Sequence, residues 1–197
     1  ERSTAASVTT TETGSSIKGF WRFDETNTSF RDYSGGGNSV NFRSDALFFD
    51  GVDDTVSIED SSDLEGFEKG LTVSAWVYSR QDEKGDYSWI IQKNSFNGPY
   101  YWADEGEGNG RVGARIEDSE GNRYSLNPGL EYREWTHLVM SYDPKSGYYK
   151  AFRNGELQAS SNIGDITPLQ NNSNSVRLGA GGPQSPWKGK MSDVRIY

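Results

Sequence analysis

The chain closes with Trp187-Lys-Gly-Lys-Met-Ser-Asp-Val-Arg-Ile-Tyr197, the stretch that does most to decide the fold. Apolar and polar residues alternate along it, which is typical of a half-buried β-strand. One carboxylate, Asp193, stands among the apolar residues of this strand. Because a charge in an apolar strand is costly when nothing compensates it, we expect Asp193 to have a partner.

The opening of the chain has a matching feature. Residues Ile17-Lys-Gly-Phe-Trp-Arg-Phe-Asp-Glu25 form a second strand pattern, and it ends in the carboxylate of Asp24. Two terminal strands that each present an acid predict that these strands are neighbours tied by one hard cation. Calcium suits such a site, because it takes six to eight oxygen ligands.

The predicted calcium ligands are Asp24, Asp32, Asn38 and Asp193. Asp32 and Asn38 flank a glycine-rich loop that offers backbone carbonyls as well. The alternative is that Asp24 caps a turn while Asp193 pairs with Arg22 or Arg195. The acidic cluster Asp50, Asp53 and Asp54 is a second candidate, although acidic turns are usually solvated.

Strand and turn patterns fill the rest of the chain, and no helical pattern interrupts them. Residues 71–78 alternate as a central strand, and residues 135–142 form another. Asn154-Gly155 predicts a tight hairpin, and residues 46–50 and 55–59 predict a second hairpin across an acidic turn. About a dozen short strands predict an all-β fold, a jelly-roll sandwich of two packed antiparallel sheets.

Composition narrows the function. The net charge of −9 argues against nucleic acid and anionic membranes as partners, because both need basic patches. The absence of cysteine excludes disulfides, thiol nucleophiles and thiolate zinc sites. No apolar run approaches the length that spans a bilayer. Residues 1–16 are rich in Ser and Thr and are expected to be a linker or frayed tail, followed by one domain over residues 17–197.

The order of the motifs resembles the laminin-G-like modules of the concanavalin A-like lectin/glucanase superfamily. The motifs are Phe20-Trp-Arg-Phe-Asp-Glu25, Asp32-Tyr-Ser-Gly-Gly-Gly-Asn38, Phe49-Asp-Gly-Val-Asp-Asp54, Thr72-Val-Ser-Ala-Trp-Val-Tyr78, Trp135-Thr-His-Leu-Val139, Arg153-Asn-Gly155, Leu178-Gly-Ala180 and Gly189-Lys-Met-Ser-Asp-Val-Arg-Ile-Tyr197. The resemblance implies a jelly roll of two curved antiparallel sheets. It also implies a binding module, in many members for glycans and with one structural calcium.

A glycan site needs aromatic rings for the apolar face of a sugar and polar side chains for its hydroxyls. We predict the site at Tyr100, Trp102, Arg111 and Arg115, because the two aromatics share one face of a strand and the two arginines share one face of the next. The arginines suit a carboxylate or sulfate. The alternative is a half-buried aromatic strand beside a solvated one.

Trp76 and Trp135 stand in strongly alternating strands and are expected to lie in the core, as is His137. Trp187 is expected to plug the edge of the sandwich. Retaining glucanases need two carboxylates on one strand face. The nearest approach is Glu117-Asp-Ser-Glu120, which runs into a turn, so we predict no catalytic activity.

The sequence therefore predicts a non-catalytic, calcium-stabilised carbohydrate-binding module of a secreted or cell-surface microbial protein. Its partner is a polysaccharide or glycan, it acts as a monomer, and its parent protein degrades polysaccharides or mediates adhesion. The alternatives are a protein-binding adhesion or spacer domain and, less favoured, a polysaccharide lyase or hydrolase.

Overall fold

The computed structural model describes residues 19–21, 46–65, 67–80, 88–93, 98–104, 112–179 and 186–197. These residues form thirteen strands and one short 3-10 helix. The strands are β1 (Gly19–Trp21), β2 (Leu47–Asp50), β3 (Val56–Ile58), β4 (Leu71–Ser79), β5 (Ser88–Lys93), β6 (Tyr100–Asp104), β7 (Val112–Glu117), β8 (Arg123–Leu126), β9 (Trp135–Asp143), β10 (Tyr148–Arg153), β11 (Glu156–Asn162), β12 (Val176–Leu178) and β13 (Lys188–Ile196). The 3-10 helix η1 covers Ser62–Leu64.

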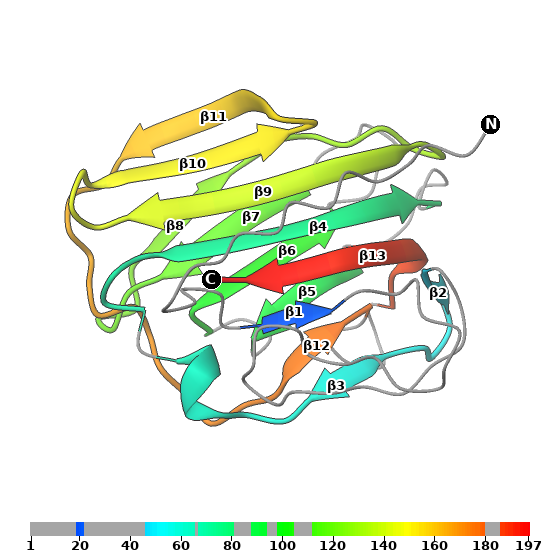
Figure 1. The fold of residues 1–197 in the computed structure, drawn as a ribbon, viewed down its shortest axis with the longest axis horizontal. Coiled ribbons are helices and arrows are strands. Elements are labelled where there is room, and N and C mark those ends of the chain that lie inside the picture. Colours follow the sequence, from blue (N-terminus) through cyan, green and yellow to red (C-terminus); the bar gives the residue numbers. More distant parts are fainter. Residues whose placement is uncertain are drawn as a thin grey trace, which may run out of the picture.

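The strands build two antiparallel sheets that lie one behind the other (Figure 1). The seven-stranded sheet has the order β1-β13-β4-β9-β10-β11, and β2 also pairs with β13. The six-stranded sheet has the order β3-β12-β5-β6-β7-β8. This arrangement confirms the predicted all-β sandwich of two antiparallel sheets.

The first and last strands are neighbours, as the sequence predicted. Phe20 of β1 lies opposite Arg195 of β13, and Trp21 lies opposite Val194. β13 continues past β1 to pair with β2 on the same side and with β4 on the other. The closing stretch of the sequence therefore connects the outermost strands of its sheet to the central ones.

The core lies between the sheets and follows from strand alternation. Along β4, Val73, Ala75 and Val77 are fully buried, and Trp76 between the last two is exposed on the other face. β6 and β7 supply Tyr100, Trp102 and Ile116 from the opposite sheet. Aromatic residues thus provide much of the buried area, in keeping with a chain that is only 32% hydrophobic.

One hairpin prediction is confirmed and another is wrong. β10 and β11 pair across the Asn154–Gly155 turn, with Arg153 opposite Glu156. β2 and β3 do not pair with each other, because β2 joins β13 and β3 joins β12 in the other sheet. The acidic turn therefore carries the chain from one sheet to the other. Both strands bury one face, and they do so from opposite sheets.

No helix of the described residues is long and apolar enough to cross a membrane.

Candidate ligand-binding face

Aromatic side chains gather on the outer face of the seven-stranded sheet. We call this group the aromatic patch; it consists of Phe48, Trp76, Tyr78, Trp135 and His137. Phe48 is 54% exposed, Trp76 is 39% exposed and Trp135 is 42% exposed. Exposed large aromatics in one place are unusual on a soluble domain and mark a binding surface.

Strand alternation places the patch on one face. β9 buries Thr136, Leu138 and Met140, so Trp135 and His137 point outward. In the register of β4 and β9, Trp76 lies opposite His137, and Tyr78 lies opposite Trp135. Four of the five rings therefore come from β4 and β9 in the middle of the sheet, and Phe48 comes from β2.

The rings form two adjacent pairs. The Trp76 and His137 rings have centroids 5.1 Å apart with planes tilted by 32°. The Tyr78 and Trp135 rings have centroids 5.7 Å apart in an edge-on arrangement of 61°. Their positions on the strands put the two pairs about 7 Å apart along the sheet. The patch therefore presents two neighbouring pairs of rings, set at different inclinations, on one face of the sheet.

Charged side chains from β13 border the patch. The Arg195 Nη2 atom lies 3.1 Å from the Asp193 Oδ2 atom. Asp193 has a φ of 52°, in the left-handed region, at the point where the pairing of β13 with β4 shifts register. Such a bulge turns a side chain away from its regular direction and occurs often near functional sites.

His137 is neutral at pH 7. Burial and then the Arg195 guanidinium lower the pKa of His137 below its ordinary value, while Asp193 acts in the opposite direction. The imidazole therefore adds an uncharged flat ring beside Trp76.

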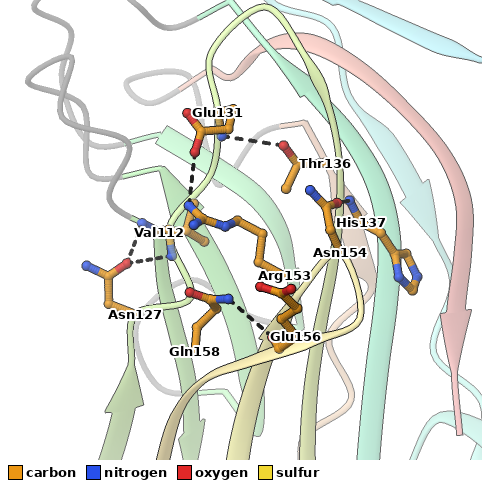
Figure 2. A network of polar contacts seen from close by, with 10 residues as sticks. Val112, Asn127, Glu131, Thr136, His137, Arg153, Asn154, Glu156 and Gln158 are labelled. Atoms are coloured by element: carbon orange, nitrogen blue, oxygen red, sulfur yellow. Dashed lines mark hydrogen bonds and ion pairs between the residues drawn. The ribbon is translucent and has the colours of Figure 1, made fainter.

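The start of β9 is fixed to the β10–β11 hairpin by the polar network in Figure 2. The Asn154 Oδ1 atom accepts a hydrogen bond from the His137 backbone N–H at 2.8 Å, and the Asn154 N–H donates to the His137 carbonyl at 2.8 Å. Arg153 pairs with Glu131 at 3.2 Å, and the Glu131 N–H donates to the Thr136 Oγ1 atom at 3.4 Å. These contacts position the Trp135–His137 end of the patch.

The residues predicted to bind sugar lie elsewhere. Tyr100 is 0% exposed and Trp102 is 1% exposed, and both side chains belong to the core between the sheets. A sugar reaches those rings only if the sandwich opens, so their burial does not support the predicted platform. Arg115 lies over the Tyr101 ring, 4.6 Å from its centroid, on the other face of that sheet. Arg111 lies outside the described residues.

Of the predicted calcium ligands, Asp193 alone lies within the described residues, and it pairs with Arg195, which is the alternative that the sequence left open. Asp24, Asp32 and Asn38 lie outside the described residues, so the terminal calcium site stays a prediction.

The second acidic candidate is a turn. The carboxylates of Asp50, Asp53 and Asp54 converge with ligand atoms within 4.8 Å of one another. The Asp50 Oδ1 atom accepts the Val52 N–H at 2.7 Å, and the Asp54 Oδ2 atom accepts the Asp50 N–H at 2.9 Å. Asp50 and Asp54 thus each accept a backbone N–H within this exposed turn, and a cation there stays a prediction.

The prediction that Trp76 and Trp135 lie in the core is wrong. Strand alternation puts each tryptophan on the outward face, because its direct neighbours on the strand are buried: Ala75 and Val77 beside Trp76, and Thr136 beside Trp135. His137 is likewise half-buried rather than in the core. Trp187 is 0% exposed, as expected for a plug at the sandwich edge.

Glu117 and Asp118 belong to the stretch that comes nearest to the carboxylate pair of a glucanase, and both make structural contacts. The Glu117 Oε2 atom is paired with Arg123 at 2.8 Å. Burial would raise the pKa of Asp118, but hydrogen bonds from Asn122, Glu120 and Tyr124 outweigh burial and hold it below its ordinary value. Asp118 therefore ties the β7–β8 turn as a stable anion, which suits a structural acid and not a proton donor.

The family follows from the sequence and agrees with the fold. Residues 49–197 match the family model described as the Concanavalin A-like lectin/glucanases superfamily, of laminin G type. The chain belongs to this superfamily. Members of the superfamily share the two-layered sandwich seen in this chain. No curated protein sequence matches it.

Solved structures with the same fold include binding domains of bacterial toxins. The receptor-binding domain of botulinum neurotoxin C/D mosaic serotype matches with a TM-score of 0.71 and 16% identity, over 92% of this chain and 48% of that one. The binding domain of Paraclostridial Mosquitocidal Protein 1 matches with a TM-score of 0.69 and 13% identity, over 92% and 48%.

A third similar structure contains a sugar. The botulinum neurotoxin serotype D ligand-binding domain in complex with N-acetylneuraminic acid matches with a TM-score of 0.65 and 16% identity, over 92% of this chain and 48% of that one. At these identities the likeness shows the fold alone. The chain spans about half the length of the solved structures that it matches.

Proposed function

We propose that this superfamily member is a non-catalytic carbohydrate-binding module, and that it binds its glycan on the aromatic patch. The observation that carries the proposal is the exposure of Trp76 and Trp135 on the outer face of the central strands. The parent protein is a secreted or cell-surface microbial protein that degrades polysaccharides or mediates adhesion, and the module acts as a monomer.

The chemistry of the patch suits sugars. Tryptophan and tyrosine rings offer flat apolar faces to the C–H groups of a pyranose, while their N–H and O–H groups serve hydroxyls. Polar side chains of β13, among them Arg195 and Asp193, stand beside the rings and can orient hydroxyl groups. The toxin domains with the same fold are receptor-binding domains, and one holds N-acetylneuraminic acid, which supports a glycan partner.

The test is the loss of glycan binding when Trp76 is replaced. We expect Trp76→Ala to lower affinity about tenfold or more, since a lost stacking contact of about 1.5 kcal/mol corresponds to that factor. Affinity electrophoresis and calorimetry against a panel of neutral and acidic polysaccharides measure it. Tyr148→Ala is the matched control. Tyr148 is an aromatic residue with a similar exposure of 42%, and it lies at the end of β10 that is far from the aromatic patch.

Two results would contradict the proposal. One is an absence of binding to every polysaccharide of the panel. The other is glycan binding that Trp76→Ala and Tyr148→Ala weaken equally, which would place the site elsewhere.

A protein partner is the second candidate. The outward face also carries an apolar row next to the patch, in which Val139 lies opposite Phe152 and Phe152 opposite Leu157, which is 54% exposed. Such a row enlarges the apolar surface beyond what one sugar covers and favours an adhesion domain.

Catalysis is the least supported function, because Glu117 and Asp118 are held by structural contacts.

Calcium is part of the proposal as a structural ion near the paired ends of the domain. It is supported by the pairing of β1 with β13, which brings the strand that precedes Asp24 next to the strand that carries Asp193. We expect EDTA to lower the melting temperature by several degrees and excess calcium to restore it. Asp24→Asn should abolish this difference. An unchanged melt of protein shown to be metal-free by elemental analysis would reject the site.

A further inference from the structure

β13 brings positive charge to one border of the aromatic patch. Lys190 and Arg195 both project from this strand onto the outer face, beside the rings of β4. The whole chain carries a net charge of −9. An unpaired cation beside a binding surface of an acidic protein indicates the charge of the ligand that this surface takes.

Lys190 is placed in line with the rings. It lies between Phe48 of β2 and Tyr78 of β4 in the register of the sheet, and Tyr78 lies next to Trp135. Its ammonium is 5.7 Å from the centroid of the Tyr78 ring. The side chain is exposed, and the ion pairs of the described residues do not include it. A cation held over a ring at the edge of a platform is ready to receive an anion.

Arg195 has a different role. It is paired with Asp193 at 3.1 Å, so the two together add no net charge to the site. His137 is neutral at pH 7, for the reasons given above. Lys190 is therefore the cation beside the rings that no carboxylate of the described residues pairs with.

We propose that the aromatic patch selects an anionic glycan, with a sugar ring on Trp76 or Trp135 and its carboxylate or sulfate on Lys190. This inference rests on the proposed function and names the ligand class of the same site. Carboxylate and sulfate share the chemistry that a lysine ammonium recognises, which is a negative charge carried by oxygens.

Two pairs of hexasaccharides test the inference, each with a charged and an uncharged member. The first pair is oligogalacturonate and its methyl ester, which differ in the carboxylate. The second is a carrageenan oligomer and its desulfated form, which differ in the sulfate. We expect calorimetry to show tighter binding of the charged member in at least one pair, and weakening of that binding as NaCl rises from about 0.05 M to about 0.5 M.

Variants locate the charge. Lys190→Met is expected to lower affinity for the charged member about 3- to 5-fold, the factor that corresponds to an exposed ion pair of about 1 kcal/mol or less. Affinity for the uncharged member should not change. Lys150→Met is the matched control, because the Lys150 ammonium lies 5.4 Å from the Tyr148 centroid on the same sheet, several residues along the strands from the patch.

The outcomes separate the two proposals. Equal affinity within both pairs overturns the inference, as does a loss that Lys190→Met and Lys150→Met share. In both cases glycan binding persists, so the proposed function stands. Failure to bind either charged oligomer also overturns the inference, and the neutral sugars of the wider panel then decide the proposed function.

Discussion

Lys93→Met is expected to lower the free energy of unfolding by about 3 kcal/mol. Lys93 is fully buried on β5, and its ammonium forms an ion pair with Asp60 and donates to the Asn174 carbonyl at 3.1 Å. Methionine keeps most of the length and volume of the side chain. The loss therefore measures the charge and not a cavity.

The cost arises from the partner that remains. Burial, and then the negative charge of Asp60, raise the pKa of Tyr100 far above its ordinary value. The Asp60 carboxylate therefore lies near the buried Tyr100 hydroxyl. Without Lys93 this carboxylate faces an apolar interior with no cation. The Asp60 side chain is 23% exposed, so water offsets part of the penalty. We therefore expect the lower end of the range of about 3–5 kcal/mol for a broken buried pair.

The double variant Lys93→Met/Asp60→Ala separates the two contributions. It removes both charges, so it should regain most of the stability that Lys93→Met loses. Urea denaturation at pH 7, followed by tryptophan fluorescence, measures all three proteins. If Lys93→Met is as stable as the protein with the unchanged sequence, the ion pair contributes nothing to stability and the argument fails.

The sandwich was predictable because its signals are local. Alternating residues 71–78 and 135–142 mark strands without knowledge of their neighbours, and Asn154–Gly155 marks its hairpin by turn chemistry. The acidic turn after β2 was misread for a complementary reason. A turn between two strands says that the chain reverses, but the sheet that each strand joins depends on distant partners, here β12 and β13.

The exposed aromatic patch was missed because tryptophan was taken as a sign of the core. The signal that locates it was present: along β4 the positions of Val73, Ala75 and Val77 are all apolar, while Trp76 shares its face with Thr72. An aromatic residue on the polar face of an alternating strand points outward. Alternation also puts Tyr101 on the face of β6 opposite to Tyr100 and Trp102, although all three side chains are buried, Tyr101 in a separate cluster with Trp89.

The tryptophans whose side chains the structure describes therefore divide into two kinds, and Trp187→Ala tests the buried kind. Trp187 is 0% exposed, and its ring lies 5.5 Å from the Phe49 ring, where the two sheets meet. The corner has no spare room. A Cβ on Gly189 would lie 2.6 Å from the Trp187 ring, and a Cβ on Gly179 would lie 2.1 Å from the Phe49 ring.

We expect Trp187→Ala to lower the free energy of unfolding by about 3–5 kcal/mol, because neighbours on three strands cannot collapse into so large a cavity. The Trp187 indole N–H has no hydrogen-bond partner among the described residues, so the loss comes from packing. Trp187→Phe should consequently lose much less. Trp135→Ala is the control: its side chain is 42% exposed, and its loss should change stability by only about 0.5–1 kcal/mol while it weakens glycan binding. Equal destabilisation by Trp187→Ala and Trp135→Ala would contradict the division, because the same residue type then contributes equally to the core and to the face that we assign to the ligand.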